Sequence, residues 1–307
     1  MQNSETTQQK NKESLKEKLS KNKELLKNLF DSYKYSMLMS TLNYYCVEHT
    51  LPKHKYDRYS KFTPYDLEVT ETLNLPEYIN ASIVQIPEHS ANNKKYLQYY
   101  AFMLPKEDYF EDFKYFLFLS NIELIVSFVD IEDYYKNSDR NKTKFDYIDP
   151  EIYKMTSQEF YGDSYSLQIF DPKDNNSQKE KVDLIRDSSP KLNKTIHRLQ
   201  FLKWPDHSIP DLHEFKQFLN FYFKIKESLK LNFVGIHCLA GVGRTGTFIL
   251  IESLIALSQK KRVERSDVFE YWMILRGQRN GLVQNCEQLE FVLDFFGLNY
   301  KLDDNSE

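Results

Sequence analysis

Cysteine, long apolar runs and excess positive charge are all scarce in this chain of 307 residues, and each scarcity argues against a class of protein. Three cysteines (Cys46, Cys238 and Cys286) are too few for a disulfide framework, and their spacing does not fit a zinc site. The sequence has no run of 18 apolar residues that could span a bilayer, and polar residues 1–14 do not resemble a signal peptide. A net charge of −4 gives no general affinity for nucleic acid or acidic membranes. We therefore expect a protein of the reducing cytoplasm.

Apolar residues are plentiful enough for a large core, at 41% of the chain with 22 tyrosines and 22 phenylalanines. Low apolar content predicts a disordered tail over residues 1–14, followed by one folded domain over 15–300 and an acidic tail over 301–307. From Leu15 onward apolar residues recur at helical spacing, which predicts an amphipathic helix. That helix could pack on its own domain or contact a partner.

Glycine is also scarce, yet four of the eight glycines fall between Gly235 and Gly246. The short apolar run 233–236 predicts a strand and the long apolar run 247–257 predicts a buried helix, so the glycines occupy a loop from strand to helix. A helix N-terminus presents unpaired amide N–H groups to an anion, and glycines let the backbone turn further N–H groups inward. The composition of this loop predicts a phosphate-binding site.

Two reactive side chains lie in the same loop, six residues apart. Cys238 would be stabilised as a thiolate by the amide groups, and the guanidinium of Arg244 could bind two phosphate oxygens at once. Cysteine and arginine at this spacing also occur by chance, and most buried cysteines are simply small core residues. The complete string, with its leading histidine, its glycines and a threonine after the arginine, favours catalysis over coincidence.

Residues 237–246, His-Cys-Leu-Ala-Gly-Val-Gly-Arg-Thr-Gly, resemble the HCxAGxGRTG motif of the protein tyrosine phosphatases. The resemblance implies an α/β fold with a central mixed, twisted sheet flanked by helices. It also implies that the phosphate is bound by Arg244 and by the backbone of the intervening loop residues, which are Leu239, Ala240, Gly241, Val242 and Gly243. Leu239 is a departure, because the family usually has serine there.

A second resemblance lies 32 residues before the cysteine, where Trp204-Pro205-Asp206 is similar to the family's mobile WPD loop. It implies that Asp206 is the general acid, which protonates the leaving oxygen as its bond to phosphorus breaks. Trp204 and, in the cysteine loop, His237 would have supporting roles. The hydroxyl of Thr245 would donate a hydrogen bond to the departing thiolate.

Residues 275–288 are similar to the family's LRxQRxxMVQTxxQ segment and imply two further catalytic residues. Gln284 would bind substrate and position water, and Gln288 would help to activate that water. Cys286 lies between them and could be redox-active or a packing thiol. The likeness also implies that Glu132 braces the catalytic arginine, although a solvated loop acid is the alternative.

The recognition segment of the family resembles residues 53–66, followed by Glu-Tyr-Ile-Asn-Ala-Ser over 77–82. Spacing to the Pro-Tyr-Asp of residues 64–66 places Tyr59 at the wall of the phosphotyrosine slot, with a merely buried tyrosine as the alternative. Lys61 stands where family members often carry an aspartate, which would alter peptide recognition.

Taken together, the resemblance implies a protein tyrosine phosphatase that acts on phosphotyrosine-containing proteins through a phosphocysteine intermediate. It implies no metal and no cofactor, since the loop supplies the positive field that a metal would otherwise provide. Two other functions stay open. A phosphotyrosine-binding module would usually lack Cys238 or Asp206, both of which are present, and a related phosphatase acting on RNA 5′-phosphates would require a basic rim.

Overall fold

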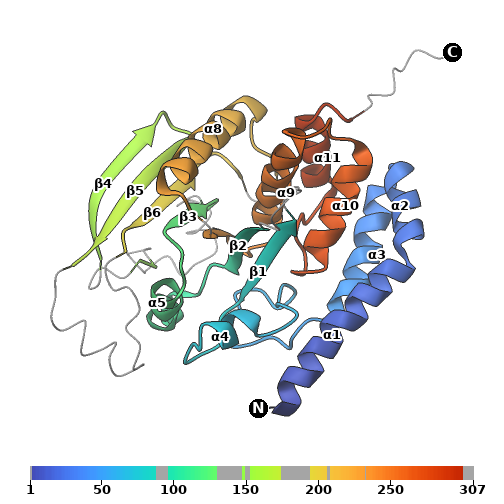
Figure 1. Cartoon of the computed structure of the whole chain (residues 1–307), viewed down its shortest axis with the longest axis horizontal. Helices are drawn as coiled ribbons and strands as arrows, with labels where there is room; N and C mark the ends of the chain where they lie inside the picture. Colours follow the sequence, from blue (N-terminus) through green and yellow to red (C-terminus); the bar gives the residue numbers. More distant parts are fainter. Residues whose placement is uncertain are drawn as a thin grey trace.

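A computed structural model describes residues 2–87, 96–129, 147–148, 153–173, 194–205, 208–231 and 233–299. Within these ranges the chain forms one seven-stranded mixed sheet with helices on both faces (Figure 1). The expected fold class, a central mixed, twisted sheet flanked by helices, is therefore confirmed.

The sheet is built around parallel strands. Its strands are β1 Ala81–Pro87, β2 Tyr96–Met103, β3 Leu124–Ser127, β4 Tyr153–Tyr161, β5 Tyr165–Pro172, β6 Ile196–Phe201 and β7 Phe233–Cys238. They lie side by side in the order β1, β2, β7, β3, β6, β5, β4. The four central strands β2, β7, β3 and β6 are parallel, whereas β1, β5 and β4 are antiparallel to their neighbours. The carboxyl ends of the four parallel strands therefore meet at one edge of the sheet.

Helices cover both faces of this sheet. Their bounds are α1 Gln2–Lys21, α2 Lys23–Asp31, α3 Tyr35–Val47, α4 Glu68–Thr72, α5 Phe110–Leu119, α8 Leu212–Leu229, α9 Gly243–Ser258, α10 Arg265–Arg276 and α11 Cys286–Phe295, with a 3₁₀ turn η1 at Glu107–Tyr109. Asp211 is the N-cap residue of α8, and its carboxylate accepts a hydrogen bond from the Glu214 N–H at 2.9 Å. Aspartate is favoured at N-caps because it satisfies an amide of the first helical turn. None of the helices in the described ranges is both long and apolar enough to cross a membrane.

Two apolar cores lie on opposite faces of the sheet. Side chains alternate along the strands, so that on β3 Ile125 enters the core beneath α5 and Val126 enters the core beneath α8, α9, α10 and α11. Helix α9 is buried over almost its entire length, as the apolar run 247–257 predicts. The phosphate-loop candidate therefore lies between a central strand and the most deeply buried helix.

The N-terminal helices pack on the α10 side of the molecule, far from β4 and β5 (Figure 1). Leu15, Leu26 and Phe30 are fully buried and belong to the same core as α9 and α10. Helix α1 begins at Gln2, within the stretch for which low apolar content predicts a disordered tail. Lysine, glutamate and glutamine have good intrinsic helix propensity, and the tail over residues 1–14 stays a prediction. Residues 300–307 lie outside the described ranges.

Candidate active site

Three chain segments bring the site together at the carboxyl edge of the parallel strands. Cys238 is the last residue of β7, Phe128 directly follows β3, and Trp204 lies three residues beyond β6. Ligands of open α/β sheets bind at this edge, because the loops that follow neighbouring strands converge there. The sheet topology thus places residues 237–247 next to Trp204.

The carbonyl groups of the loop all point away from its concave side. The Leu239 carbonyl accepts a hydrogen bond from the Leu104 N–H at 3.1 Å, and the Val242 carbonyl accepts from Gly246 at 2.9 Å and from Val283 at 3.2 Å. The carbonyls of Ala240 and Gly241 accept from the guanidinium of Arg279, at 3.4 and 2.9 Å. In a trans peptide the N–H points opposite to the carbonyl before it. The N–H groups of residues 240–243 are therefore turned toward the concave side, as an anion nest requires.

Glycine is required at two positions of this loop for steric reasons. Gly241 has a φ of 68°, and a Cβ there would lie 2.1 Å from the Phe102 carbonyl oxygen at the end of β2. A Cβ at Gly246 would lie 2.3 Å from the Val283 backbone nitrogen. Any side chain at either position would push the loop away from the backbone that holds its shape.

The Cys238 thiol lies in the loop that leads into the N-terminus of α9. Its side chain is only 4% exposed, and its sulfur accepts a hydrogen bond from the Thr245 hydroxyl at 3.4 Å. Helix α9 begins at Gly243, so the amides of its first turn have no acceptor within the helix. These amides and the helix dipole favour a negative charge, either on the sulfur or on an anion beside it.

Arg244 is fixed by backbone carbonyl groups from two other segments. Its guanidinium is 2% exposed, and Nη1 donates to the carbonyl oxygens of Phe128 at 2.6 Å and Trp204 at 3.0 Å. The indole Nε1 of Trp204 in turn donates to the Ser208 carbonyl at 2.8 Å. The guanidinium is thereby tied to the end of β3 and to the Trp-Pro-Asp segment, which orders it before any ligand arrives.

His237 is fully buried and held at both ring nitrogens. Nδ1 lies 3.4 Å from the Cys238 carbonyl and Nε2 lies 2.8 Å from the Tyr147 hydroxyl. A carbonyl can only accept, so Nδ1 carries the proton and Nε2 accepts from tyrosine. Burial lowers the pKa of His237 to about 3, against the opposing effect of the Cys238 carbonyl. The imidazole is therefore neutral at pH 7 and braces the backbone at the cysteine.

Gln284 and Gln288 both reach the start of α9. A Cβ at Gly243 would lie 2.9 Å from Gln284 Oε1 and 2.9 Å from Gln288 Nε2. Gln288 is buried, and its Oε1 accepts a hydrogen bond from the Gln284 N–H at 2.9 Å. The structure thus brings both predicted glutamines to the loop, from the segment that also supplies Val283.

Tyr59 packs against the same core as the loop residue Leu239, and its role as the wall of the slot stays a prediction. Its half-buried ring packs against the core that contains Leu239 and meets the Phe62 ring edge-on, with the ring centroids 6.5 Å apart. Asp206 and Glu132 lie outside the described residues. The acid role of Asp206 and the bracing role of Glu132 therefore stay predictions.

Sequence reasoning missed the hydrogen-bond network around Arg279 that holds the carbonyl side of the loop. Arg279 is buried and, besides the loop carbonyls, donates to Asn80 Oδ1 at 2.8 Å and to Ser82 Oγ at 3.2 Å. Asn80 donates to the Asp57 carboxylate at 2.7 Å, which also accepts from the Tyr78 hydroxyl at 2.9 Å. Burial lowers the pKa of Arg279 to about 10, so it remains a cation at pH 7. The sequence offered one indication of this role, because Arg279 lies within residues 275–288, the segment that supplies Gln284 and Gln288.

Comparisons with known proteins agree with this geometry. A family model described as protein-tyrosine phosphatase matches residues 53–296. Tyrosine-protein phosphatase non-receptor type 20 of Mus musculus is 26% identical over 254 residues, which cover 80% of this chain and 54% of the mouse protein. Non-receptor type 2 of Rattus norvegicus is 38% identical over 102 residues, or 32% of this chain and 24% of the rat protein. The chain therefore spans about half the length, or less, of these relatives.

Within the described residues, no group of three or more histidine, cysteine or acidic side chains is arranged to hold a metal ion.

Proposed function

The chain belongs to the protein-tyrosine phosphatase family, and on that premise we propose that it hydrolyses phosphotyrosine in proteins through a phosphocysteine intermediate. The observation that supports this proposal most directly is the orientation of the loop. Carbonyls of Leu239, Gly241 and Val242 are held on the outside, so that the intervening amides face the space beside the Cys238 sulfur. A tetrahedral dianion at that place would meet N–H donors without rearrangement of the backbone.

In the proposed first step, the Cys238 thiolate attacks the phosphorus of phosphotyrosine. The S–P bond forms as the P–O bond to the tyrosine breaks, while loop amides and Arg244 hold the three equatorial oxygens. Asp206 gives its proton to the leaving tyrosine oxygen, which otherwise departs poorly as an anion. The step leaves phosphocysteine, the dephosphorylated tyrosine side chain and an ionised Asp206.

In the proposed second step, water attacks the phosphocysteine. Gln284 and Gln288 orient the water, which fits their convergence on Gly243. Asp206 takes a proton from the water, and Thr245 stabilises the departing thiolate through the hydrogen bond it already donates at 3.4 Å. The products are phosphate and the restored thiol site, and no metal takes part in either step.

Specificity for phosphotyrosine over phosphoserine would come from the depth of the slot that leads to Cys238. If Tyr59 walls the slot above Cys238, only a long aryl phosphate reaches the sulfur, and a phosphoserine does not. The natural partners are then phosphotyrosine-containing proteins, in the reducing cytoplasm that keeps the nucleophile as a thiol.

The proposal is tested by phosphate release from three substrates: phosphotyrosine peptide, phosphoserine peptide and RNA with a 5′-phosphate. We expect release from the first alone, and none from the Cys238→Ser variant, since an alcohol is a far weaker nucleophile. Vanadate binding to that variant serves as a control for an intact loop. Phosphate release by the Cys238→Ser variant would contradict the covalent mechanism. A preference for RNA with a 5′-phosphate would show that the substrate is RNA and not a phosphotyrosine protein.

The Asp206→Ala variant separates an enzyme from a binding module. Removing the acid should lower kcat by about 10² to 10⁴ with little rise in KM, because the acid acts mainly on the transition state. The variant should then retain phosphotyrosine proteins that vanadate displaces, and wild type should release them. Equal capture and equal lifetimes for both proteins, with no phosphate released by either, would support a binding module instead.

A further inference from the structure

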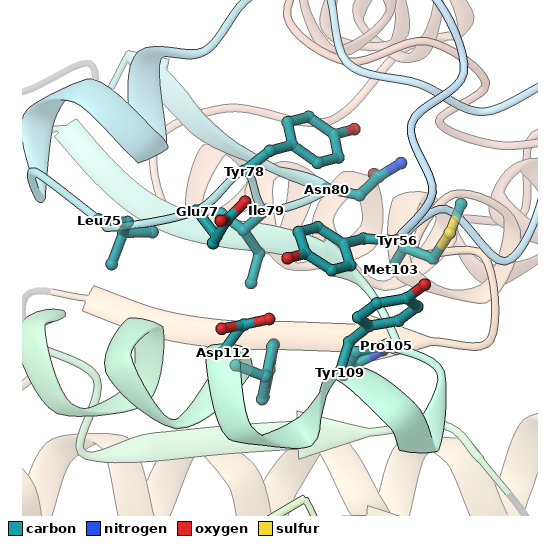
Figure 2. A pocket seen from close by; sticks show the side chains of 11 residues that line it. Tyr56, Leu75, Glu77, Tyr78, Ile79, Asn80, Met103, Pro105, Tyr109 and Asp112 are labelled. Atoms are coloured by element: carbon teal, nitrogen blue, oxygen red, sulfur yellow. The ribbon is translucent and has the colours of Figure 1, made fainter.

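A small cavity lies beside the recognition segment and outside the site described above. Its wall includes Tyr56, Tyr78 and Tyr109, two carboxylates from Glu77 and Asp112, and the Met103 side chain (Figure 2). We call it the Tyr56 cavity. Tyr56 is three residues from Tyr59 in the chain, and its side chain lines the cavity (Figure 2).

The lining combines aromatic rings with negative charge. Figure 2 shows the Tyr56 hydroxyl directed between the carboxylates of Glu77 and Asp112, which come from different segments of the chain. The Tyr56 ring is buried and meets the Tyr109 ring edge-on, with centroids 4.1 Å apart. Burial, and then the hydrogen bond with Asp112, raise the pKa of Tyr56, so its hydroxyl stays neutral. The charge of the lining comes from the two carboxylates.

These carboxylates lack a cationic partner within the described part of the chain, where no lysine or arginine forms an ion pair with Glu77 or Asp112. The ring of Tyr56 nevertheless attracts an ammonium group. The Lys55 Nζ lies 4.7 Å from its centroid, although Lys55 does not line the cavity. Aromatic faces and carboxylates together are the surroundings that bind organic cations in proteins.

Size distinguishes between the possible cations. The enclosed part of the cavity has a volume of about 20 Å³, which is the space open to the centre of a water-sized group. The empty space rises to about 390 Å³ when the open mouth is included. An ammonium head is about the size of water and fits this interior, which is just above the minimum for one such group. A planar guanidinium is larger than an ammonium head. The open mouth leaves space for a carbon stem.

We propose that the Tyr56 cavity binds a primary alkylammonium group, with the ammonium at the carboxylates of Glu77 and Asp112 beside the Tyr56 hydroxyl, and the carbon stem along the tyrosine rings. The source of such a group is either the lysine side chain of a polypeptide or a free amine.

The position of the cavity favours lysine as the source, an extension that rests on the proposed function. Met103 in its wall is the β2 residue paired with Cys238 of β7. Asn80, also in the wall, donates to Asp57 and accepts from Arg279, which holds the phosphate loop. A polypeptide whose phosphotyrosine occupies the loop could therefore place a nearby lysine in the cavity.

The first experiment measures binding without turnover. NMR spectra of the protein with labelled tyrosine rings are recorded while n-butylammonium is added, with n-butanol as the neutral probe of the same stem. We expect saturable shifts with n-butylammonium alone, and at least about tenfold weaker binding after Glu77→Gln with Asp112→Asn. The control double variant Glu13→Gln with Glu227→Gln, which changes two exposed carboxylates elsewhere, should bind as wild type does.

Equal shifts with n-butanol, or unchanged binding after Glu77→Gln with Asp112→Asn, would overturn the proposal. Should that double variant fail to fold, Tyr109→Leu provides the second test, because it removes one aromatic wall and leaves both carboxylates. Unchanged n-butylammonium binding to a folded Tyr109→Leu protein would overturn the proposal equally. None of these results depends on phosphatase activity, so failure here and failure of the proposed function are distinguishable.

The second experiment identifies the source. Phosphotyrosine peptides carrying one lysine at successive positions are compared with norleucine peptides, which have the same stem without the ammonium. A lysine source predicts that KM is about fivefold to tenfold lower at one position, and that Glu77→Gln with Asp112→Asn removes this advantage without changing kcat. If KM is the same for both peptides while n-butylammonium binds, the lysine source is rejected and the site takes a free amine.

Discussion

His237 shows how one buried side chain positions the proposed nucleophile next to it. The imidazole donates to the Cys238 carbonyl through Nδ1 and accepts from the Tyr147 hydroxyl through Nε2. It also stacks on the Phe102 ring, with centroids 4.9 Å apart. A cationic imidazole could not accept from tyrosine, so the arrangement is stable only while His237 is neutral.

This requirement predicts a pH dependence of folding. Burial lowers the pKa of His237 in the folded protein to about 3, below an unfolded value near 6.5. Between pH 6.5 and pH 3 the unfolded state binds a proton at His237 that the folded state does not. The contribution of neutral His237 to the free energy of unfolding is therefore fully present above pH 6.5 and is lost as the pH falls below it. From pH 7 to pH 5 the free energy of unfolding should fall by about 2 kcal/mol through this residue. Urea unfolding at both pH values measures the loss.

The matched variants for this test are His237→Gln and His213→Gln. Glutamine at 237 can still donate and accept hydrogen bonds but does not titrate. The decrease in the free energy of unfolding between pH 7 and pH 5 should therefore be about 2 kcal/mol smaller in His237→Gln than in wild type. His213 is exposed on α8, and its replacement should leave the wild-type loss unchanged. An equal pH dependence in all three proteins would show that His237 does not carry the effect.

Arg279 holds the loop in a way that only a guanidinium can. Its three nitrogens reach Gly241, Asn80 and Ser82 at once, whereas the single ammonium of lysine cannot. Arg279→Lys should therefore weaken vanadate binding and lower kcat/KM by about 10- to 100-fold, because the loop carbonyls lose their outer donors. Inhibition by vanadate gives the measurement. Arg262→Lys, at an exposed position, is the control and should change neither value.

The contact between the phosphate loop and β2 depends on one glycine. Gly241 and Gly162 both have positive φ, at 68° and 59°, so alanine at either costs about 1 to 2 kcal/mol of backbone strain. Only at 241 would the Cβ also meet the Phe102 carbonyl, at 2.1 Å, whereas it would meet nothing within 4 Å at 162. Gly241→Ala should therefore lose about 3 kcal/mol more in urea unfolding, together with vanadate binding. Similar losses for both variants would mean that the loop can move away from β2.

Sequence reasoning succeeded where structure is decided locally. Strand β7 follows from the short apolar run 233–236, and the loop follows from glycines clustered before a buried helix. It failed for Tyr147 and Arg279, whose partners lie 90 and 38 residues away in the chain. No periodicity connects residues at such separations, so only the folded sheet shows that they meet. The same holds for the Tyr56 cavity, which takes its wall from several separate segments.

The N-terminal helices raise the question of where the folding unit ends. The family match begins at residue 53, yet α1, α2 and α3 precede it and contribute to the core shared by α9 and α10. The Arg265 guanidinium lies 4.9 Å from the centroid of the Phe30 ring and donates to the Tyr35 hydroxyl at 2.7 Å. Contacts of this kind join the helices to α10, which carries the Gln284 segment at its carboxyl end.

If the N-terminal helices and the sheet form one cooperative unit, a cavity beneath α2 should weaken the entire molecule. Phe30 is fully buried against Phe269, with ring centroids 5.4 Å apart, so Phe30→Ala should lower the free energy of unfolding by about 3 to 5 kcal/mol. Leu25→Ala, on the same helix but 49% exposed, should cost less than about 1 kcal/mol. Far-UV circular dichroism and the fluorescence of the two tryptophans, both buried in the shared core, should report one coincident transition. An early loss of helix signal while tryptophan fluorescence stays native would instead show that α1 to α3 unfold separately, and that the catalytic domain begins nearer residue 53.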